Sequence, residues 1–128
     1  MWKSFEREVE KVCSMHGFEV ERNFVFKDDH GKCEIDLVAK RFDLVICIDT
    51  KFYSAKRYRV SQLKKEAEKH FKRCKRFEKI IKKKCIPVLV PFIDDKIYFH
   101  GGCLIVPFNS FNEFLFNVHY YLMSFQLL

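Results

Sequence analysis

The stretch Leu44-Val45-Ile46-Cys47-Ile48-Asp49-Thr50-Lys51-Phe52 decides the fold. Its first five residues are all apolar, a run too continuous for an edge strand, so we expect a strand in the middle of a sheet that is covered on both faces. Because alternate residues of a strand share a face, Asp49 and Lys51 project together, with Thr50 opposite. A carboxylate beside an ammonium group at the end of a buried strand suits a site that holds a metal ion and a phosphate.

Helices and further strands flank this strand, as the spacing of their apolar residues indicates. We expect helices over about residues 2–16, 61–84 and 110–124, and further strands over about 18–26, 32–40, 86–92, 96–100 and 103–107. The resulting order is α-β-β-β-α-β followed by a strand–helix tail. This order predicts an α/β fold, a mixed sheet flanked by helices.

Length and composition are those of one folded domain. The chain has 128 residues, of which 48% are hydrophobic and 32% charged, enough to bury a single core. We expect one domain over residues 1–128, with its core over about 2–92 and a C-terminal extension over about 96–128. No apolar run approaches the roughly 18 residues of a membrane span, and no signal peptide is visible. The six cysteines lack metal-site spacing, so we interpret them as reduced structural thiols of a cytoplasmic protein.

Positive charge is concentrated in one segment. The formal net charge is +7, yet residues 64–84 alone hold eleven Lys or Arg and three Glu, a net of +8. Such a segment favours a polyanionic partner, although a solvated helix face rich in Lys has the same composition. The loop before it mixes basic and aromatic residues, which suits contact with phosphates and bases, or an ordinary exposed loop. We expect the residues that contact DNA to be Lys56, Arg57, Arg59, Lys72, Arg73, Lys75 and Arg76.

The strand over 32–40 carries two further acidic residues, Glu34 and Asp36, which share a face. A short turn folds this strand back on the next one, antiparallel. We expect simple pairing to place Asp36 far from Asp49, so that the two carboxylates meet only if the strands splay or cross. Glu34 is a candidate for holding a water or a ligand residue of the same site in place, and a solvated Glu at a strand end is the alternative.

Candidate residues also occur on both flanking helices. At about 100° per residue, Glu6 borders the buried face of the first helix, while Glu8 lies near its other shoulder. Gln62 opens the basic helix shortly after Lys51, where it could touch DNA or the site. The five histidines show no ligand spacing, and we interpret them as structural.

Four motifs in a fixed order resemble the archaeal Holliday junction resolvases and the type IV restriction endonucleases of the PD-(D/E)xK nuclease superfamily. They are Glu6-Arg7-Glu8, His16-Gly17-Phe18, Ile35-Asp36-Leu37-Val38 and Asp49-Thr50-Lys51. The family pattern is a Glu on a helix, an Asp at the end of a strand and (D/E)-x-K on the next strand. The likeness covers about residues 5–92. The segment from Phe18 to Asp36 is longer than in the resolvases, a departure that concerns junction specificity more than the fold.

The resemblance implies a restriction-endonuclease-like sheet, in which the two strands diverge, and a metal-dependent DNA endonuclease. Its catalytic residues would be Glu6, Asp36, Asp49 and Lys51. Asp36, Asp49 and the Thr50 backbone carbonyl would hold Mg²⁺ or Mn²⁺, with Glu6 acting through a water. Lys51 would orient the attacking water or stabilise charge on phosphate oxygens. A structure-selective, resolvase-like enzyme and a restriction- or repair-type enzyme both fit. The alternative from another class is a catalytically silent nucleic-acid-binding module with the same fold.

The last helix is rich in aromatic residues. One helical stripe comprises Phe111, Phe114, Leu115, Val118, Leu122 and Phe125, which the domain's own sheet can cover. Phe116, Tyr120 and Tyr121 widen the apolar surface beyond that stripe, and such patches often mark interfaces. Together with the resolvase resemblance, this predicts a homodimer that forms partly through this helix. A monomer with a thick aromatic core is the alternative.

Overall fold

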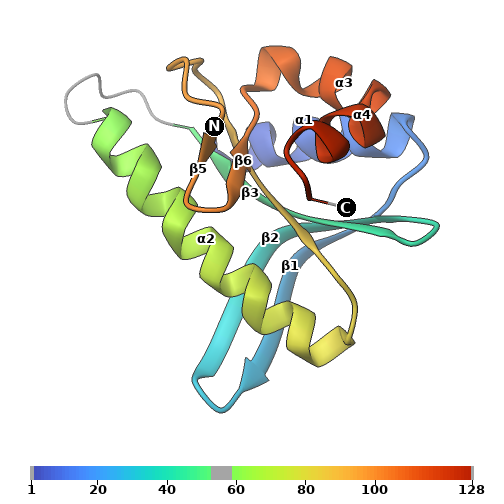
Figure 1. Cartoon of the computed structure of the whole chain (residues 1–128), viewed down its shortest axis with the longest axis vertical. Coiled ribbons are helices and arrows are strands. Elements are labelled where there is room, and N and C mark those ends of the chain that lie inside the picture. The colour runs from blue at the N-terminus through green and yellow to red at the C-terminus, as the bar shows by residue number, and fades with distance from the viewer. Residues whose placement is uncertain (1, 53–58, 128) are drawn as a thin grey trace.

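The computed structural model describes residues 2–52 and 59–127, which form a six-stranded mixed sheet flanked by helices (Figure 1). The elements are α1 (Trp2–Met15), β1 (Glu19–Asp28), β2 (Gly31–Arg41), β3 (Leu44–Lys51), α2 (Arg59–Ile81), β4 (Ile86–Pro91), β5 (Phe99–His100), β6 (Cys103–Ile105), α3 (Phe108–Phe116) and α4 (Val118–Ser124). The expected mixed α/β fold is confirmed.

The strands lie in the order β1-β2-β3-β4-β6-β5. β1, β2 and β3 form an antiparallel meander, β4 and β6 run parallel to β3, and β5 runs antiparallel to β6. β3 is a central strand, and six of its eight residues are buried. The continuous apolar run therefore predicts its position correctly, because a strand covered on both faces has no solvent-facing side for polar residues.

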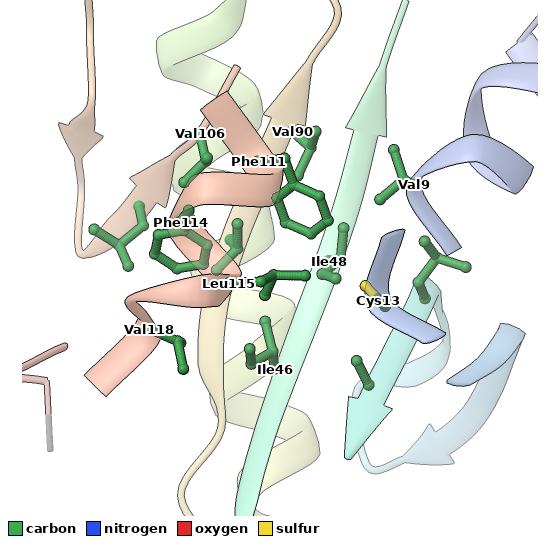
Figure 2. Packing of buried hydrophobic residues seen from close by; sticks show 14 of the residues in the cluster. Val9, Cys13, Ile46, Ile48, Val90, Val106, Phe111, Phe114, Leu115 and Val118 are labelled. Carbon is green, nitrogen blue, oxygen red and sulfur yellow. The ribbon is translucent and has the colours of Figure 1, made fainter. Parts of the chain in front are cut away.

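Helices cover the two faces of the sheet unequally (Figure 1). α1, α3 and α4 pack on one face, where Ile46 and Ile48 of β3 meet Val9 and Phe111 in the larger core cluster (Figure 2). α2 packs on the other face, where Cys47 belongs to the same cluster as residues of α2. Asp49 and Lys51 share the parity of Cys47, so they project toward α2.

The β1–β2 hairpin is bent at the level of Asp36. Pairing passes from Arg22 with Leu37 directly to Phe24 with Ile35, and Asn23, opposite Asp36, has a φ of 51°. Asn tolerates this left-handed conformation better than most residues. The alternation of faces is broken at the same point, because Ile35 packs on the α2 side and Leu37 on the α1 side. Figure 1 shows this hairpin turning away from the rest of the sheet.

Among the elements, α2, β5 and the last helix differ from the expected ones in ways that have a local cause. α2 ends at Ile81 instead of residue 84, since Lys82 adopts a φ of 54°. The strand expected over 96–100 is reduced to β5, because Lys96 has a φ of 60° and donates its N–H to Asp94. The expected single last helix is two helices, with a break at Asn117, whose side-chain amide donates to the Glu113 carbonyl oxygen at 3.2 Å.

The six cysteines are free thiols, all of them buried. Their burial agrees with the interpretation that they pack as small apolar residues. Within residues 2–52 and 59–127, no helix is both long and apolar enough to cross a bilayer.

Candidate functional site

The β2–β3 hairpin itself brings Asp36 and Asp49 together. The last paired residues are Leu37 and Ile48, so Asp36 immediately precedes the ladder and Asp49 immediately follows it. The expectation that simple pairing would separate them is wrong, because the turn sets a register in which positions 36 and 49 face each other. The pairing of β2 with β3 ends at this point. Asp36 Oδ2 accepts hydrogen bonds from the Thr50 backbone N–H at 3.0 Å and from the Thr50 hydroxyl at 3.3 Å.

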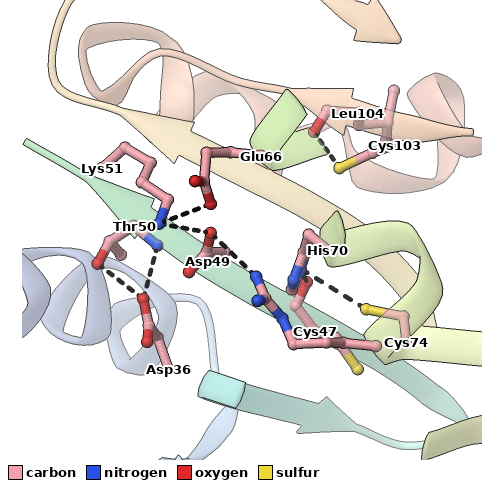
Figure 3. Close-up of polar contacts among 11 residues, drawn as sticks. Asp36, Cys47, Asp49, Thr50, Lys51, Glu66, His70, Cys74, Cys103 and Leu104 are labelled. Carbon is pink, nitrogen blue, oxygen red and sulfur yellow. Dashed lines mark hydrogen bonds and ion pairs between the residues drawn. The ribbon is translucent and has the colours of Figure 1, made fainter. Parts of the chain in front are cut away.

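A cleft of about 410 Å³ lies where the strands part. Its lining consists of Glu34, Asp36, Asp49, Thr50, Lys51, Phe52 and Arg73. Three of the four predicted catalytic residues therefore converge, as Figure 3 shows for Asp36, Asp49 and Lys51. Asp49 is only 4% exposed, and its Oδ2 accepts no hydrogen bond from the described residues. A buried carboxylate oxygen needs positive charge close by, which makes Asp49 a candidate ligand for a cation.

Helix α2 contributes charged residues to this cleft. The Lys51 ammonium lies 3.3 Å from Asp49 Oδ2 and 3.1 Å from the carboxylate of Glu66 on α2 (Figure 3). From the same helix, the Arg73 guanidinium lies 3.3 Å from Asp49 Oδ2. Asp49 thus faces two cations, and Lys51 is held between two carboxylates. The site is built between β3 and α2, with Asp36 closing it from β2.

His70 of α2 lies beneath these charges and is fully buried. Its Nε2 lies 2.8 Å from the Cys47 carbonyl oxygen, and because a carbonyl only accepts, Nε2 carries the proton. Burial lowers the pKa of His70, which leaves the ring neutral at neutral pH. His70 therefore ties α2 to β3 two residues before Asp49 and fixes the spacing between helix and strand.

The two aspartates titrate as a close pair. Burial, followed by a hydrogen bond to Asp49 and the charge of Asp49, raises the pKa of Asp36 to about 7. Burial alone would raise the pKa of Asp49 as well, but its neighbours, Lys51 and Arg73 among them, hold that pKa below its usual range. The pair therefore holds one proton below about pH 7. Two carboxylates placed this closely favour a shared proton or a shared cation.

The residues of the cleft fit a magnesium or manganese site. Mg²⁺ prefers oxygen ligands, keeps several waters and is often bound through one or two carboxylates. Asp49, whose Oδ2 accepts no hydrogen bond from the described residues, and the neighbouring Asp36 supply such a pair. Within the described part of the chain, no three Asp, Glu, His or Cys side chains are grouped to hold a metal ion by themselves. The predicted contribution of the Thr50 carbonyl stays a prediction.

Glu6 is buried but lies apart from this cleft. It is 2% exposed on α1, and its Oε2 has no partner among the described residues. It lines a separate polar hollow of about 550 Å³, between α1 and β1, together with Lys3, Arg7, Glu10, Val20, Arg22 and Asn23. Burial raises the pKa of Glu6; Lys3 and Arg22 oppose the rise, and Glu34 and Asp49 add to it. Glu6 is thus within electrostatic range of Asp49, and its role through a water stays a prediction.

The other candidate residues divide into exposed and paired groups. Glu34 is exposed at the cleft, and Gln62 is exposed beside Glu66 in a neighbouring hollow. Lys72 and Lys75 are exposed on α2, as a surface that contacts DNA requires. Lys56 and Arg57 lie outside the described residues.

Two of the expected DNA contacts are held within the protein. Arg59 pairs with Asp95, and Arg76 pairs with Asp28, each at 2.6 Å with further hydrogen bonds to the same carboxylate. Arginine forms such bidentate pairs readily, because its planar fork matches a carboxylate. These two side chains anchor α2 to the loop after β4 and to the β1–β2 turn, and the structure does not leave them as open contacts for DNA.

Sequence reasoning missed what the inner face of α2 supplies. Glu66 is absent from the expected site residues although it pairs with Lys51. His70 has the structural role expected for the histidines, and Arg73, expected to contact DNA, lines the cleft. The three residues are spaced i, i+4 and i+7, which places them on one helical face. The available signal for this face was Glu66, an acidic residue in a helix that is rich in Lys and Arg.

Comparisons with known proteins show which structure has a similar fold and which protein has a similar sequence. No protein-family model matches the chain. The crystal structure of AF1548, a protein of unknown function, is similar with a TM-score of 0.62 and 21% identity over 85% of this chain. The chain spans 59% of that protein, and the likeness supports the mixed α/β fold alone. An uncharacterized protein of Archaeoglobus fulgidus is 54% identical over 127 residues, which cover 99% of this chain and 98% of that protein. The chain belongs to the same family as this archaeal protein.

Proposed function

We propose that the protein is a Mg²⁺- or Mn²⁺-dependent DNA endonuclease that hydrolyses phosphodiester bonds. The observation that carries the proposal is the convergence of Asp36, Asp49 and Lys51 in one cleft at the point where β2 and β3 part. The resemblance to the PD-(D/E)xK superfamily assigns catalytic roles to the same residues. The basic surface of α2, beside the cleft, supports a polyanionic substrate.

Each residue of the cleft has a distinct task in this reaction. Asp36 and Asp49 would hold the divalent cation, which supplies Lewis acidity at the phosphate and lowers the pKa of a water. Lys51, held between Asp49 and Glu66, presents its ammonium group to charge that develops on the phosphate. Glu66 positions Lys51 from the helix side. Glu6 would order a water from the side of α1.

The position of DNA, the oligomeric state and the cellular location follow from the same proposal. DNA would lie along α2, where exposed lysines contact phosphates. Two strands are cut by two active sites in a homodimer. A reducing, cytoplasmic location fits both the substrate and the six free thiols.

Cleavage assays on a panel of DNA substrates test the proposal. Labelled duplex, single-stranded, flap and four-way substrates are incubated with Mg²⁺, with Mn²⁺ or with EDTA. We expect metal-dependent cleavage of at least one substrate, and preference for the four-way substrate would identify a resolvase-like enzyme. Binding of DNA without cleavage of any substrate, under either metal, would favour the catalytically silent module instead.

A further inference from the structure

Arg73 is held differently from the other two arginines on α2. Arg59 and Arg76 each make bidentate pairs with hydrogen bonds of 2.6 to 2.9 Å. Arg73 approaches Asp49 Oδ2 at 3.3 Å, and that oxygen accepts no hydrogen bond from the described residues. The buried Nε of Arg73 likewise has no acceptor among them. An arginine with a purely structural role normally satisfies its donors, as Arg59 and Arg76 do.

The position of Arg73 conflicts with a cation on Asp49. The Asp49 oxygen that accepts no hydrogen bond from the described residues, and that a metal ion would bind, is the one that both Lys51 and Arg73 approach. Lys51 has a second carboxylate, Glu66, at 3.1 Å. A divalent cation on Asp49 would repel the Arg73 guanidinium from this oxygen. Arg73 lines the cleft and is 26% exposed, so its side chain can turn into the space that a phosphate would occupy.

We propose that Arg73 is a phosphate-binding residue of the site. In the metal-free protein it neutralises Asp49. When a divalent cation occupies Asp36 and Asp49, the Arg73 guanidinium moves from Asp49 to a non-bridging oxygen of the DNA phosphate. A guanidinium suits this exchange, since its fork of N–H donors pairs with a carboxylate and with a phosphate in the same geometry. The inference rests on the proposed function and names a residue that acts beyond the superfamily pattern.

The exchange couples metal binding to DNA binding. The metal ion and Arg73 compete for Asp49, while the metal ion and DNA assist each other because each draws Arg73 away from Asp49. Such coupling is reciprocal between the two ligands. Removing the Arg73 charge should therefore tighten metal binding in the absence of DNA and weaken the gain in DNA affinity that a metal ion brings.

Two binding measurements on Arg73→Gln, Arg73→Lys and Lys11→Gln test this coupling. Lys11 is an exposed cation of α1 that pairs with Glu8, so Lys11→Gln removes the same charge away from the cleft. Mn²⁺ affinity is measured by calorimetry without DNA, and the affinity for the tightest-binding substrate of the panel is measured by anisotropy in Ca²⁺ and in EDTA. In Arg73→Gln we expect Mn²⁺ to bind about tenfold more tightly, on the order of one partly screened charge contact. The Ca²⁺-induced gain in DNA affinity should fall about tenfold on the same basis.

The other variants separate a phosphate contact from a structural role. Lys11→Gln should keep both wild-type affinities. Arg73→Lys should keep most of the Ca²⁺-induced gain in DNA affinity, because it retains the charge. Weaker Mn²⁺ binding in Arg73→Gln, or unchanged values of both quantities, overturns the inference. If Arg73→Gln does not fold, as judged by its melting curve, Arg73→Lys decides the matter. A Ca²⁺-induced gain in DNA affinity equal to that of wild type supports the charge contact, and loss of this gain overturns it. A wild-type protein that binds neither Mn²⁺ nor DNA overturns the proposed function itself.

Discussion

At the scale of single residues, Asp49 combines deep burial with an oxygen that accepts no hydrogen bond from the described residues and with two neighbouring cations. We expect Asp49→Asn to abolish cleavage, with a loss on the order of 10³-fold, because one charge of the metal site is removed. DNA binding measured in EDTA should stay within about threefold of wild type, since phosphate contacts elsewhere persist. Cleavage assays and filter binding check the two parts. Cleavage by this variant at the wild-type rate would refute the assigned role.

Asp36 predicts a pH dependence of metal binding. Its folded pKa of about 7 lies above the ordinary value of 3.8, so the metal-free pair must release a proton before it binds a cation. Mn²⁺ affinity should rise about tenfold per pH unit below pH 7 and level off above it. Calorimetry between pH 5.5 and about pH 8.5 measures the profile. Asp36→Asn should bind more weakly, with a flat profile in this range; a sloping profile in that variant would assign the proton to another group.

The raised pKa of Asp36 also predicts that Asp36→Asn stabilises the metal-free protein. Because the folded pKa is raised, the stabilising contribution of protonated Asp36 is fully present below the unfolded pKa and is lost as pH rises through about 7. At pH 8 the wild type must bury two carboxylates side by side, whereas the amide is neutral. We expect the melting temperature of Asp36→Asn to exceed that of wild type by about 4 °C at pH 8. The difference should shrink or vanish at pH 5.

At the scale of elements, α2 has two faces with separate tasks. Glu66, His70 and Arg73 face β3, while Lys72 and Lys75 are exposed on the outer side. Each Lys that neutralises a phosphate releases a counterion, so DNA affinity falls as salt rises. We expect Lys72→Gln combined with Lys75→Gln to reduce the slope of log affinity against log salt by about 2. The exposed pair Lys11→Gln and Lys40→Gln is the charge-matched control, and an equal loss of slope in both would mean that the outer face has no special role.

The element scale also separates what periodicity can predict from what it cannot. The apolar run of β3 predicts a central strand, and its parity predicts that Asp49 and Lys51 point the same way; both hold because packing sets them locally. The meeting of Asp36 with Asp49 depends on hairpin register and on a bend at Asn23, which alternation does not encode. Likewise, an i, i+4, i+7 pattern marks the inner face of α2, but only tertiary packing shows which strand that face meets.

At the scale of the whole molecule, the C-terminal elements carry both core and surface aromatics. Phe111, Phe114, Leu115, Val118 and Leu122 are buried, as their common stripe predicts, whereas Phe125, expected on the same stripe, is 37% exposed because it follows the end of α4. Outside the stripe, Phe116, Tyr120 and Met123 are 78%, 68% and 68% exposed. Tyr121, also expected to widen the exposed surface, is instead partly buried against the core. Phe125 lies 5.3 Å from Phe99, centroid to centroid, so the exposed end of α4 continues onto the edge strand β5. Exposed apolar surface beside an unpaired strand edge favours self-association.

We therefore predict that the protein is a homodimer that buries this surface. Sedimentation at micromolar concentration should give a species of twice the 15.5 kDa of one chain. Tyr120→Glu combined with Phe116→Glu should shift it to the monomer, because two charges would be buried without partners at the interface core. Phe42→Glu is the control for an added charge at an exposed aromatic residue, since Phe42 is 96% exposed at the β2–β3 turn. A wild-type monomer that persists on tenfold concentration would show that these aromatics face solvent in the native state, and the two active sites would then require another arrangement to reach both strands of DNA.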